Sequence, residues 1–302
     1  MKIVTLGNIP LHTNLKKLVS NLESQQYDLL ILTGNYSYYI HDEFGRKGDV
    51  FFNELEPILT KAPIFALPGN IDMVSYGSFF FHRFRFLENL KTIDNNVFVL
   101  KYFDMRITFI NFEIYPVLSK KNKRNMIVFL EKNLSVTSSK LDLLVSHRPF
   151  RCLSSMEKEI CFFEGSYFYE DFEKILIPYK MDIQLCSHLS MYQRFNISIF
   201  QNRYNKLSEY WNDSNYQLTT IISGIGGAAA QELLFRTKVS KYNKSVFKNY
   251  VFGYTKLTIK NAFRTVIGST VDIQDTTTTK EIDSFVITPD QHIKRTITKL
   301  KL

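Results

Sequence analysis

A run of four apolar residues, Leu29–Leu32, leads directly into the turn Thr33-Gly34-Asn35. Four successive apolar residues are typical of a strand that is covered on both faces of its sheet. A second apolar run, Ile3–Leu6, precedes a segment with helical spacing, Asn14–Ser24. The opening therefore reads as a β-α-β unit, which predicts two parallel strands joined by a right-handed crossover. This unit places the chain in the α/β class.

The rest of the chain continues the pattern of apolar segments separated by turns. Expected helices are Asp49–Leu59, interrupted near its end by Pro57, then Met126–Leu134 and Tyr167–Ile177. The aromatic segment Phe79–Phe86 is expected in the core. Expected strands are Pro63–Ala66, Val97–Leu100, Ile107–Phe112, Leu141–Val145, Met181–Cys186, Ile197–Phe200, Leu218–Ser223, Tyr254–Ile259, Thr265–Ile273 and Ile282–Ile287.

The composition restricts the class of protein. With 302 residues, 45% of them hydrophobic, the chain can bury a large core. No apolar run is long enough to span a bilayer, so we expect no transmembrane segment. The N-terminus is too short and strand-like to be a signal peptide. We therefore expect a cytosolic protein, or one whose leader is missing from the sequence.

The formal net charge of +9 permits attraction to acidic molecules. Basic residues gather at Lys238–Lys248 and again from Lys294 to Lys301. One hypothesis is that these two segments dock acidic partners. No recognition motif accompanies the charge, so we do not expect a nucleic-acid-binding role.

Polar turns follow several of the expected strands. They are Gly7-Asn8, Gly34-Asn35, Gly69-Asn70, Ser146-His147 and Ser187-His188. In an open α/β sheet, ligands bind outside the carboxyl ends of the strands. These turns are therefore the expected functional edge of the sheet. Each turn also has a simpler interpretation, because Asn tolerates left-handed backbone geometry and a single His at a strand end is commonly a hydrogen-bonded turn residue.

The ordered set of turns resembles the metallophosphoesterases, and most closely the purple acid phosphatases of the calcineurin-like superfamily. Gly34-Asn35-Tyr36-Ser37-Tyr38 resembles that family's Gly-Asp-x-x-Tyr motif, and Pro68-Gly69-Asn70-Ile71-Asp72 its Pro-Gly-Asn-His-Glu motif. Ser146-His147-Arg148-Pro149 resembles its Gly-His-Arg-Pro block, and His188-Leu189-Ser190-Met191-Tyr192-Gln193-Arg194 its His-x-His-x-Tyr-x-Arg block. The resemblance implies a sandwich of two mixed β-sheets flanked by helices. It spans residues 1–289 as one phosphatase-like domain and leaves 290–302 as a basic tail.

The resemblance also implies which residues would hold the family's two metal ions, iron with zinc, manganese or a second iron. Tyr38, Asn70, His147 and His188 keep residue types that the family uses as ligands. Three ligand positions are changed: Asn8 and Asn35 replace aspartates, and Ser190 replaces a histidine. Ile71 stands where the family has the histidine that assists the leaving group. Tyr192 and Arg194 are retained but peripheral.

The changed positions predict a degenerate site. Two metal ions held close together need anionic ligands between them, and an amide offers only a neutral oxygen. Tyr38 is the one phenol left to supply an anion, and without a ferric ion its pKa is expected to stay near 10. The leading hypothesis is a catalytically inactive phosphatase-like protein with no cofactor, which serves as a binding or structural module for an unknown protein partner.

The alternative is an active metal-dependent acid phosphatase with an altered site. The retained Asn70, His147, His188 and Tyr38 would hold one weakly bound divalent ion, and a metal-bound hydroxide would attack a phosphate ester. Cys152 and Cys161 resemble a pair that is disulfide-bonded in relatives, which would favour the secretory route common in the family. Cys186 is expected to be a small core residue.

Overall fold

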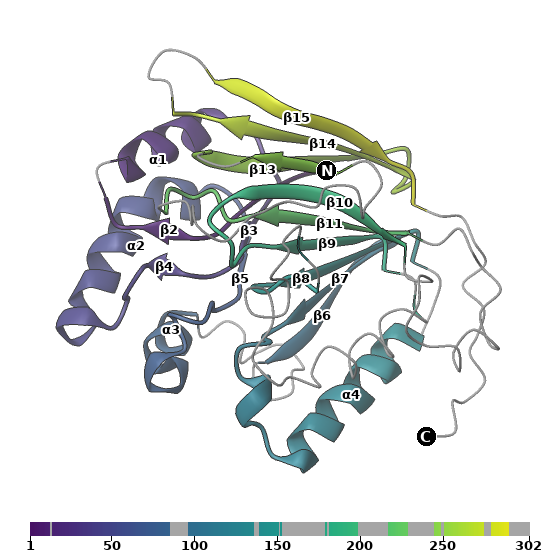
Figure 1. Cartoon of the computed structure of the whole chain (residues 1–302), viewed down its shortest axis with the longest axis horizontal. Helices are drawn as coiled ribbons and strands as arrows, with labels where there is room; N and C mark the ends of the chain where they lie inside the picture. The colour runs from purple at the N-terminus through teal and green to yellow at the C-terminus, as the bar shows by residue number, and fades with distance from the viewer. Residues whose placement is uncertain are drawn as a thin grey trace.

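The structure, a computed structural model, describes residues 1–12, 14–84, 96–135, 139–150, 152, 179, 181–198, 217–228, 245–248, 251–274 and 279–289. Two large sheets dominate it and lie against each other, with helices outside them (Figure 1). The predicted sandwich of two mixed β-sheets flanked by helices is confirmed.

The first sheet contains the N-terminal strands. Its order is β15 (Lys280–Ile287), β14 (Thr265–Asp272), β13 (Gly253–Lys260), β1 (Lys2–Leu6), β3 (Leu29–Leu32) and β5 (Ile64–Ala66). Strands β1 and β3 are parallel, with Ile3 opposite Leu29, so the predicted β-α-β opening is confirmed. All four residues of β3 are buried, as the apolar run predicts for a strand covered on both faces.

The second sheet is also mixed. Its order is β12 (Val246–Lys248), β10 (Tyr192–Ser198), β11 (Gln217–Ser223), β9 (Ile183–Cys186), β8 (Leu141–Ser146), β7 (Met105–Ile110) and β6 (Val97–Tyr102). Strands β7, β8 and β9 are parallel to one another, so their carboxyl ends meet at one edge of the sheet. A short parallel pair, β2 (Ile9–Pro10) and β4 (Tyr36–Ser37), extends from the ends of β1 and β3.

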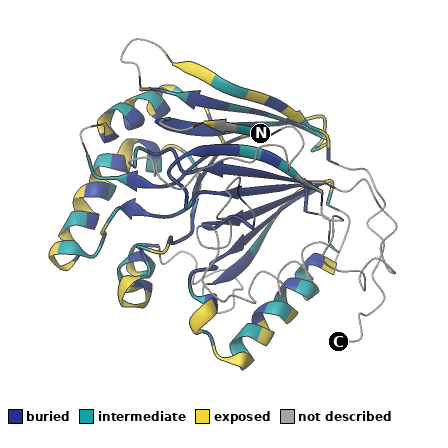
Figure 2. Ribbon diagram, viewed as in Figure 1, coloured by how far each residue is buried: buried dark blue, intermediate teal, exposed yellow. Residues whose placement is uncertain are grey.

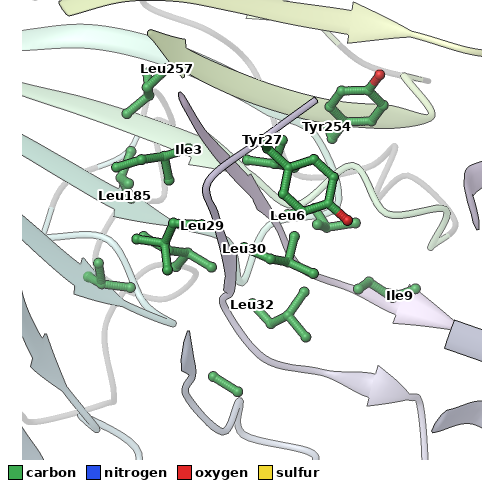
Figure 3. Packing of buried hydrophobic residues seen from close by; sticks show 14 of the residues in the cluster. Ile3, Leu6, Ile9, Tyr27, Leu29, Leu30, Leu32, Leu185, Tyr254 and Leu257 are labelled. Carbon is green, nitrogen blue, oxygen red and sulfur yellow. The ribbon is translucent and has the colours of Figure 1, made fainter. Parts of the chain in front are cut away.

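The hydrophobic core lies between the sheets and under the helices. One cluster joins residues of both sheets, including Leu30 of β3 and Leu185 of β9 (Figure 3). It also takes in the apolar side of α1 (Leu15–Ser24) and α2 (Arg46–Leu59). A second cluster packs α4 (Lys120–Ser135) on the second sheet. The inner strands are accordingly the most buried elements, whereas the edge strand β15 and the outer faces of the helices are partly exposed (Figure 2).

Several element boundaries differ from the prediction. Helix α2 begins at Arg46, before the expected Asp49, and continues past Pro57 to Leu59. Helix α4 begins at Lys120, because its first turns are exposed polar residues that carry no apolar periodicity. The remaining short elements are the helix α3 (Ser78–Arg83) and the 3-10 helices η1 (Asp42–Gly45), η2 (Val74–Gly77) and η4 (Tyr115–Val117).

The predicted position of strand β10 was wrong. The strand expected at Ile197–Phe200 instead runs from Tyr192 to Ser198. Its first half was missed because polar side chains face the interior there and are paired. Asp283 of β15 accepts hydrogen bonds from Tyr192 Oη and Arg194 Nε, both at 2.6 Å. This carboxylate therefore links the two sheets, which gives Tyr192 and Arg194 a structural role.

Parts of some predictions fall outside the described residues. These are the helix expected at Tyr167–Ile177, most of the basic segment Lys238–Lys248, and the tail 290–302. In the part of the chain that the structure describes, no helix is both long enough and apolar enough to cross a bilayer.

Candidate functional site

The polar turns predicted at the strand ends lie together at one edge of the sandwich. The backbone N–H of Asn8 donates to the carbonyl oxygen of Gly34 at 2.9 Å, and that of Ser187 to the carbonyl oxygen of His147 at 2.9 Å. Across the two sheets, Ser187 Oγ donates to the Thr33 carbonyl oxygen at 2.7 Å. The loops after β1, β3, β8 and β9 are thus joined directly.

Close backbone packing explains the glycines in this region. A Cβ atom on Gly34, whose φ is +98°, would lie 2.7 Å from Gly69 Cα and 2.7 Å from His147 Nδ1. A Cβ atom on Gly69 would collide with the side chain of Asn35. Both positions therefore need glycine, and they allow the loops after β3 and β5 to touch.

Asn8 and Asn35 form a pair of amides at the centre of the site. Asn35 Nδ2 donates to Asn8 Oδ1 at 3.2 Å. Asn8 Nδ2 in turn lies 3.1 Å from the His188 carbonyl oxygen and 3.4 Å from Ser190 Oγ. Asn35 Oδ1 accepts the backbone N–H of Ile71 at 3.2 Å. Both amides are buried, and both of their side-chain oxygens accept hydrogen bonds within the protein.

Left-handed backbone geometry occurs at several residues of these loops. Asn8 (φ 56°) and Asn35 (φ 62°) adopt it, as expected for asparagine, whereas Asn70 does not. His188 (φ 58°), a residue type that also tolerates it, adopts it too, and so does Tyr38 (φ 54°), whose bulky side chain makes it unfavourable. Strained residues of this kind persist only where the surrounding structure holds them.

His147 and His188 are adjacent, with ring centroids 5.2 Å apart. The Thr33 carbonyl oxygen can only accept, so it fixes the His147 tautomer that carries its hydrogen on Nδ1. His147 Nδ1 donates to that oxygen at 2.6 Å, and His188 Nδ1 donates to His147 Nε2 at 3.4 Å. The Asn70 Oδ1 position lies 3.1 Å from the same His147 Nε2; because an amide oxygen and this nitrogen both accept, the contact is a hydrogen bond only with the Asn70 amide flipped, so that Nδ2 donates. Both imidazoles are neutral in this arrangement, and burial lowers the pKa of His147 to about 3.

Arg148 places a positive charge beside the histidines. Its Nη1 lies 2.7 Å from His188 Nε2 and donates to it. Its Nε pairs with the Glu113 carboxylate, with the nearer oxygen at 2.9 Å. Burial raises the pKa of Glu113 to about 6, although the Arg148 cation acts in the opposite direction. Sequence motifs gave no role to Glu113, which lies on the loop after β7 and carries no motif signal of its own.

Tyr38, a retained position, and Ser190, a changed one, contact each other. The Tyr38 hydroxyl lies 3.3 Å from Ser190 Oγ. Burial raises the pKa of Tyr38 above its ordinary value, which corrects the expectation that it stays near 10. Ile71 is on the loop after β5, where its backbone N–H contacts Asn35, and its side chain offers no proton.

Asp72 organises two of the loops and was not singled out by its position in the sequence. Its carboxylate accepts the backbone N–H groups of Asn35 at 2.6 Å, Gly69 at 2.8 Å and Tyr36 at 3.0 Å. Burial raises the pKa of Asp72 to about 7, against the lowering effect of these hydrogen bonds. The side chain therefore ties the loop after β5 to the loop after β3, behind the amide pair.

We expect protonation of His147 to destabilise the fold. Its pKa is lower in the folded protein than the usual 6.5, so the unfolded chain binds the proton more tightly. The stabilising contribution of this group is then lost as the pH falls below about 6.5. At pH 5 its contribution should be about 2 kcal/mol smaller than at pH 7, from about 1.4 kcal/mol per pKa unit. The raised pKa values of Asp72 and Glu113 act in the opposite direction, so urea unfolding at the two pH values measures the His147 contribution as the difference between the wild type and a His147 variant, both chelator-treated.

The matched variants for this prediction are His147→Gln and His82→Gln. His82 is exposed on α3, outside the candidate site, so its replacement controls for the removal of a histidine as such. The His147→Gln protein should lose about 2 kcal/mol less than the wild type between pH 7 and pH 5. Identical slopes for all three proteins would show that His147 does not carry the effect.

The cysteines are only partly described. Cys152 is disulfide-bonded, and Cys161, its expected partner, lies outside the described residues, so that pairing stays a prediction. Cys186 is a buried free thiol, as expected for a core residue. Among the described residues, no group of three or more His, Cys, Asp or Glu side chains is arranged to hold a metal ion.

Comparisons with known proteins agree with this architecture. The calcineurin-like phosphoesterase family matches the sequence over residues 10–192. A search of curated proteins returned no significant match. The structure resembles that of the purple acid phosphatase PPD1 of yellow lupin (Lupinus luteus), with a TM-score of 0.70 and 19% sequence identity. That match covers 96% of this chain but only 54% of the lupin chain.

Two other solved structures match over nearly their whole length. GAP50, described as the anchor in the inner membrane complex of Plasmodium, has a TM-score of 0.64 and 12% identity, covering 97% of this chain and 90% of that one. A dimetal phosphatase from Danio rerio has a TM-score of 0.60 and 9% identity, covering 96% and 99%. At these identities the likeness shows a shared fold.

Proposed function

The chain belongs to the calcineurin-like phosphoesterase family, and from this premise we propose that it is a purple acid phosphatase-like protein that has lost catalysis and acts as a binding or structural module. The observation that carries the proposal is the amide pair. Asn8 and Asn35 occupy two aspartate positions of the resembled family, and their side chains hydrogen-bond to each other at 3.2 Å. The proposal includes the absence of a resident two-metal cofactor.

The chemistry of the donors supports this proposal. Two metal ions about 3.5–4 Å apart need negative charge between them. An amide oxygen is neutral, and an amide N–H repels a cation. Asn8 Oδ1 and Asn35 Oδ1 already accept hydrogen bonds from Asn35 Nδ2 and from the Ile71 backbone. The residues present therefore do not fit a two-metal centre.

The histidines give a second argument. His188 Nε2 accepts a hydrogen bond from Arg148, so its lone pair is not free in this arrangement. A metal ion at His188 would have to displace a guanidinium that is buried and paired with Glu113. Displacing one partner of a buried ion pair is expensive, because the other charge is left without compensation.

The remaining changes remove other parts of the resembled mechanism. Ile71 cannot donate a proton, and a positioned acid or base contributes typically about 10²–10⁴ in rate. Ser190 Oγ is a poorer ligand than an imidazole, and it is close to both Tyr38 and Asn8 here. The changes act on charge, metal ligation and proton transfer together. They therefore favour the loss of metal-dependent catalysis over an active site with altered ligands.

A non-catalytic role has a parallel in the same fold. The Plasmodium protein of similar structure is described as an anchor in a membrane complex. At 12% identity this shows only that the architecture is compatible with such a role. For the present chain we propose a protein partner, whose identity the site does not specify.

Metal content and turnover test the proposal together. We expect the protein purified without chelators to carry far less than one iron, zinc or manganese ion per chain. Hydrolysis of a simple phosphomonoester such as p-nitrophenyl phosphate should not exceed background across acidic and neutral pH. A known dimetal phosphatase, purified and assayed in parallel, controls for metal loss during preparation. Stoichiometric metal with turnover above background would reject the proposal.

The second candidate function is a phosphomonoesterase with a single divalent ion. It is favoured by one observation: the side chains of Asn70, His147 and His188 converge within hydrogen-bonding distance. In that case the same assay would show metal-dependent turnover, and His147→Ala would abolish it. Turnover that is unchanged in His147→Ala would instead point to a contaminating phosphatase.

A further inference from the structure

An aromatic cluster projects from the end of the sandwich opposite the candidate site. It consists of Tyr102 and Phe103 in the β6–β7 hairpin and Phe263 in the β13–β14 hairpin. Phe103 is 83% exposed and Tyr102 47%. Tyr102 and Phe103 have ring centroids 4.8 Å apart, and each lies 6.5 Å from Phe263.

The sheet topology fixes where this cluster lies. Strand β7 is parallel to β8, whose carboxyl end carries His147, so the β6–β7 turn is at the other end. Strand β13 is antiparallel to β1, whose carboxyl end leads to Asn8, so the β13–β14 turn is also there. Both hairpins lie at the right-hand end of the sandwich in Figure 1, away from β2 and β4.

Basic residues surround the aromatic cluster. Exposed cations flank both hairpins, and Asp104, the carboxylate in the first hairpin, pairs with one of them. The cations are Lys101, Lys140, Lys260 and Arg264. Lys101, Lys260 and Arg264 have no carboxylate partner among the described residues. Among the described residues of the two hairpins and Lys140, four positive charges stand against the one negative charge of Asp104, so this surface is basic.

An open cavity extends the basic surface. It has a volume of about 500 Å³, and Lys260 lies on its lining as well as beside the β13–β14 turn. Lys2 and Lys61 also line it, together with one carboxylate, Asp28. Asp28 accepts the backbone N–H of Lys2 at 2.6 Å. Lysines therefore outnumber carboxylates here too.

We propose that this hairpin surface, defined as residues 101–104, 140 and 260–264, docks onto an anionic lipid membrane. Aromatic side chains exposed at loop tips suit the interface between headgroups and acyl chains. Lysines around them attract anionic headgroups, each contributing about a fivefold increase in binding. Neither the insertion of aromatic rings nor the attraction of lysines to headgroups requires a transmembrane helix.

Charge and shape favour a membrane over other occupants. Single-stranded nucleic acid is bound along a positively charged groove in which bases stack on aromatic rings. Here the rings stand at the tips of two projecting hairpins and two of them contact each other edge to face, at 87°. A second copy of the chain would bring like charges together, because the surface is basic. The inference does not depend on whether the site at the other end is active.

Co-sedimentation of the full chain with vesicles tests the proposal. The probes are vesicles of phosphatidylcholine alone and of phosphatidylcholine mixed with phosphatidylserine. We expect binding to the mixed vesicles that falls steeply as salt is added, and little binding to the neutral ones. Phe103→Ser with Phe263→Ser should weaken binding at least tenfold. Lys101→Glu with Lys260→Glu should weaken it at least about 25-fold, from about fivefold per charge.

Matched variants at the other end of the molecule provide the controls. Phe44→Ser removes a fully exposed ring from η1, and Lys16→Glu with Lys121→Glu makes the same charge change on α1 and α4. These variants should bind vesicles within twofold of the wild-type protein. All substituted side chains are exposed or half-buried, and unchanged thermal unfolding verifies the fold.

Three results would overturn the proposal. The first is equal binding to neutral and anionic vesicles. The second is hairpin variants that bind like the control variants. The third is a wild-type protein that binds single-stranded RNA, or forms dimers, through the hairpin residues while leaving anionic vesicles unbound.

Discussion

Replacing Arg106 by alanine is expected to lower the free energy of unfolding by about 3–5 kcal/mol. Arg106 lies on β7 and is 2% exposed. Its Nε donates to Asp142 Oδ1 on β8 at 2.6 Å, and its Nη1 donates to the carbonyl oxygens of Asn133 and Leu134 at 3.1 and 3.0 Å. Alanine would leave a buried carboxylate and two carbonyl groups at the end of α4 without this donor.

Two comparisons distinguish the cost of leaving a buried charge unpaired from the cost of losing an ion pair in general. Arg46 is 72% exposed on α2 and pairs with Glu43, so Arg46→Ala should cost about 1 kcal/mol or less. Replacing both Arg106 and Asp142 by apolar residues of similar size should recover much of the loss, because no buried charge is left alone. Urea unfolding measures all three variants. A loss below about 1 kcal/mol for Arg106→Ala would show that water reaches the pair.

Changing Asn8 and Asn35 together to aspartate should make the stability of the protein dependent on metal ions. In the wild type the two side chains hydrogen-bond at 3.2 Å. Two ionised carboxylates about 4 Å apart repel by about 4 kcal/mol at an effective dielectric constant of 20. We therefore expect the metal-free double variant to lose several kcal/mol of stability above the pH at which both carboxyls ionise.

Divalent ions should then stabilise the double variant. Binding only to the folded state at a hundred times the dissociation constant adds about 2.7 kcal/mol. Thermal unfolding with and without Mn²⁺ or Zn²⁺ measures this, and the wild-type midpoint should not move. Asn53→Asp with Asn125→Asp makes the same charge change at exposed helical positions and controls for bulk charge. A wild type that is stabilised as much as the double variant would contradict the proposed loss of the metal site.

The apolar pattern was sufficient to predict much of the architecture. The parallel pairing of β1 and β3, the burial of Leu29–Leu32 and the positions of most later strands along the chain follow from it. The order of the strands within each sheet does not. These features depend on local spacing, because a strand buried on both faces must be apolar throughout. The start of β10 was missed for the converse reason, since Tyr192 and Arg194 are satisfied by Asp283, 91 and 89 residues away along the chain.

The residue types of the candidate site could also be found from the sequence, because the turns that carry Asn8, Asn35, Asn70, His147 and His188 each follow an apolar run. Their contacts could not. That the two amides bind each other, that Arg148 donates to His188, and that Asp72 holds two loops together are properties of groups distant in sequence. Turn chemistry is local and can be read from neighbouring residues, whereas the partner that satisfies each buried polar group is decided only when the two sheets pack.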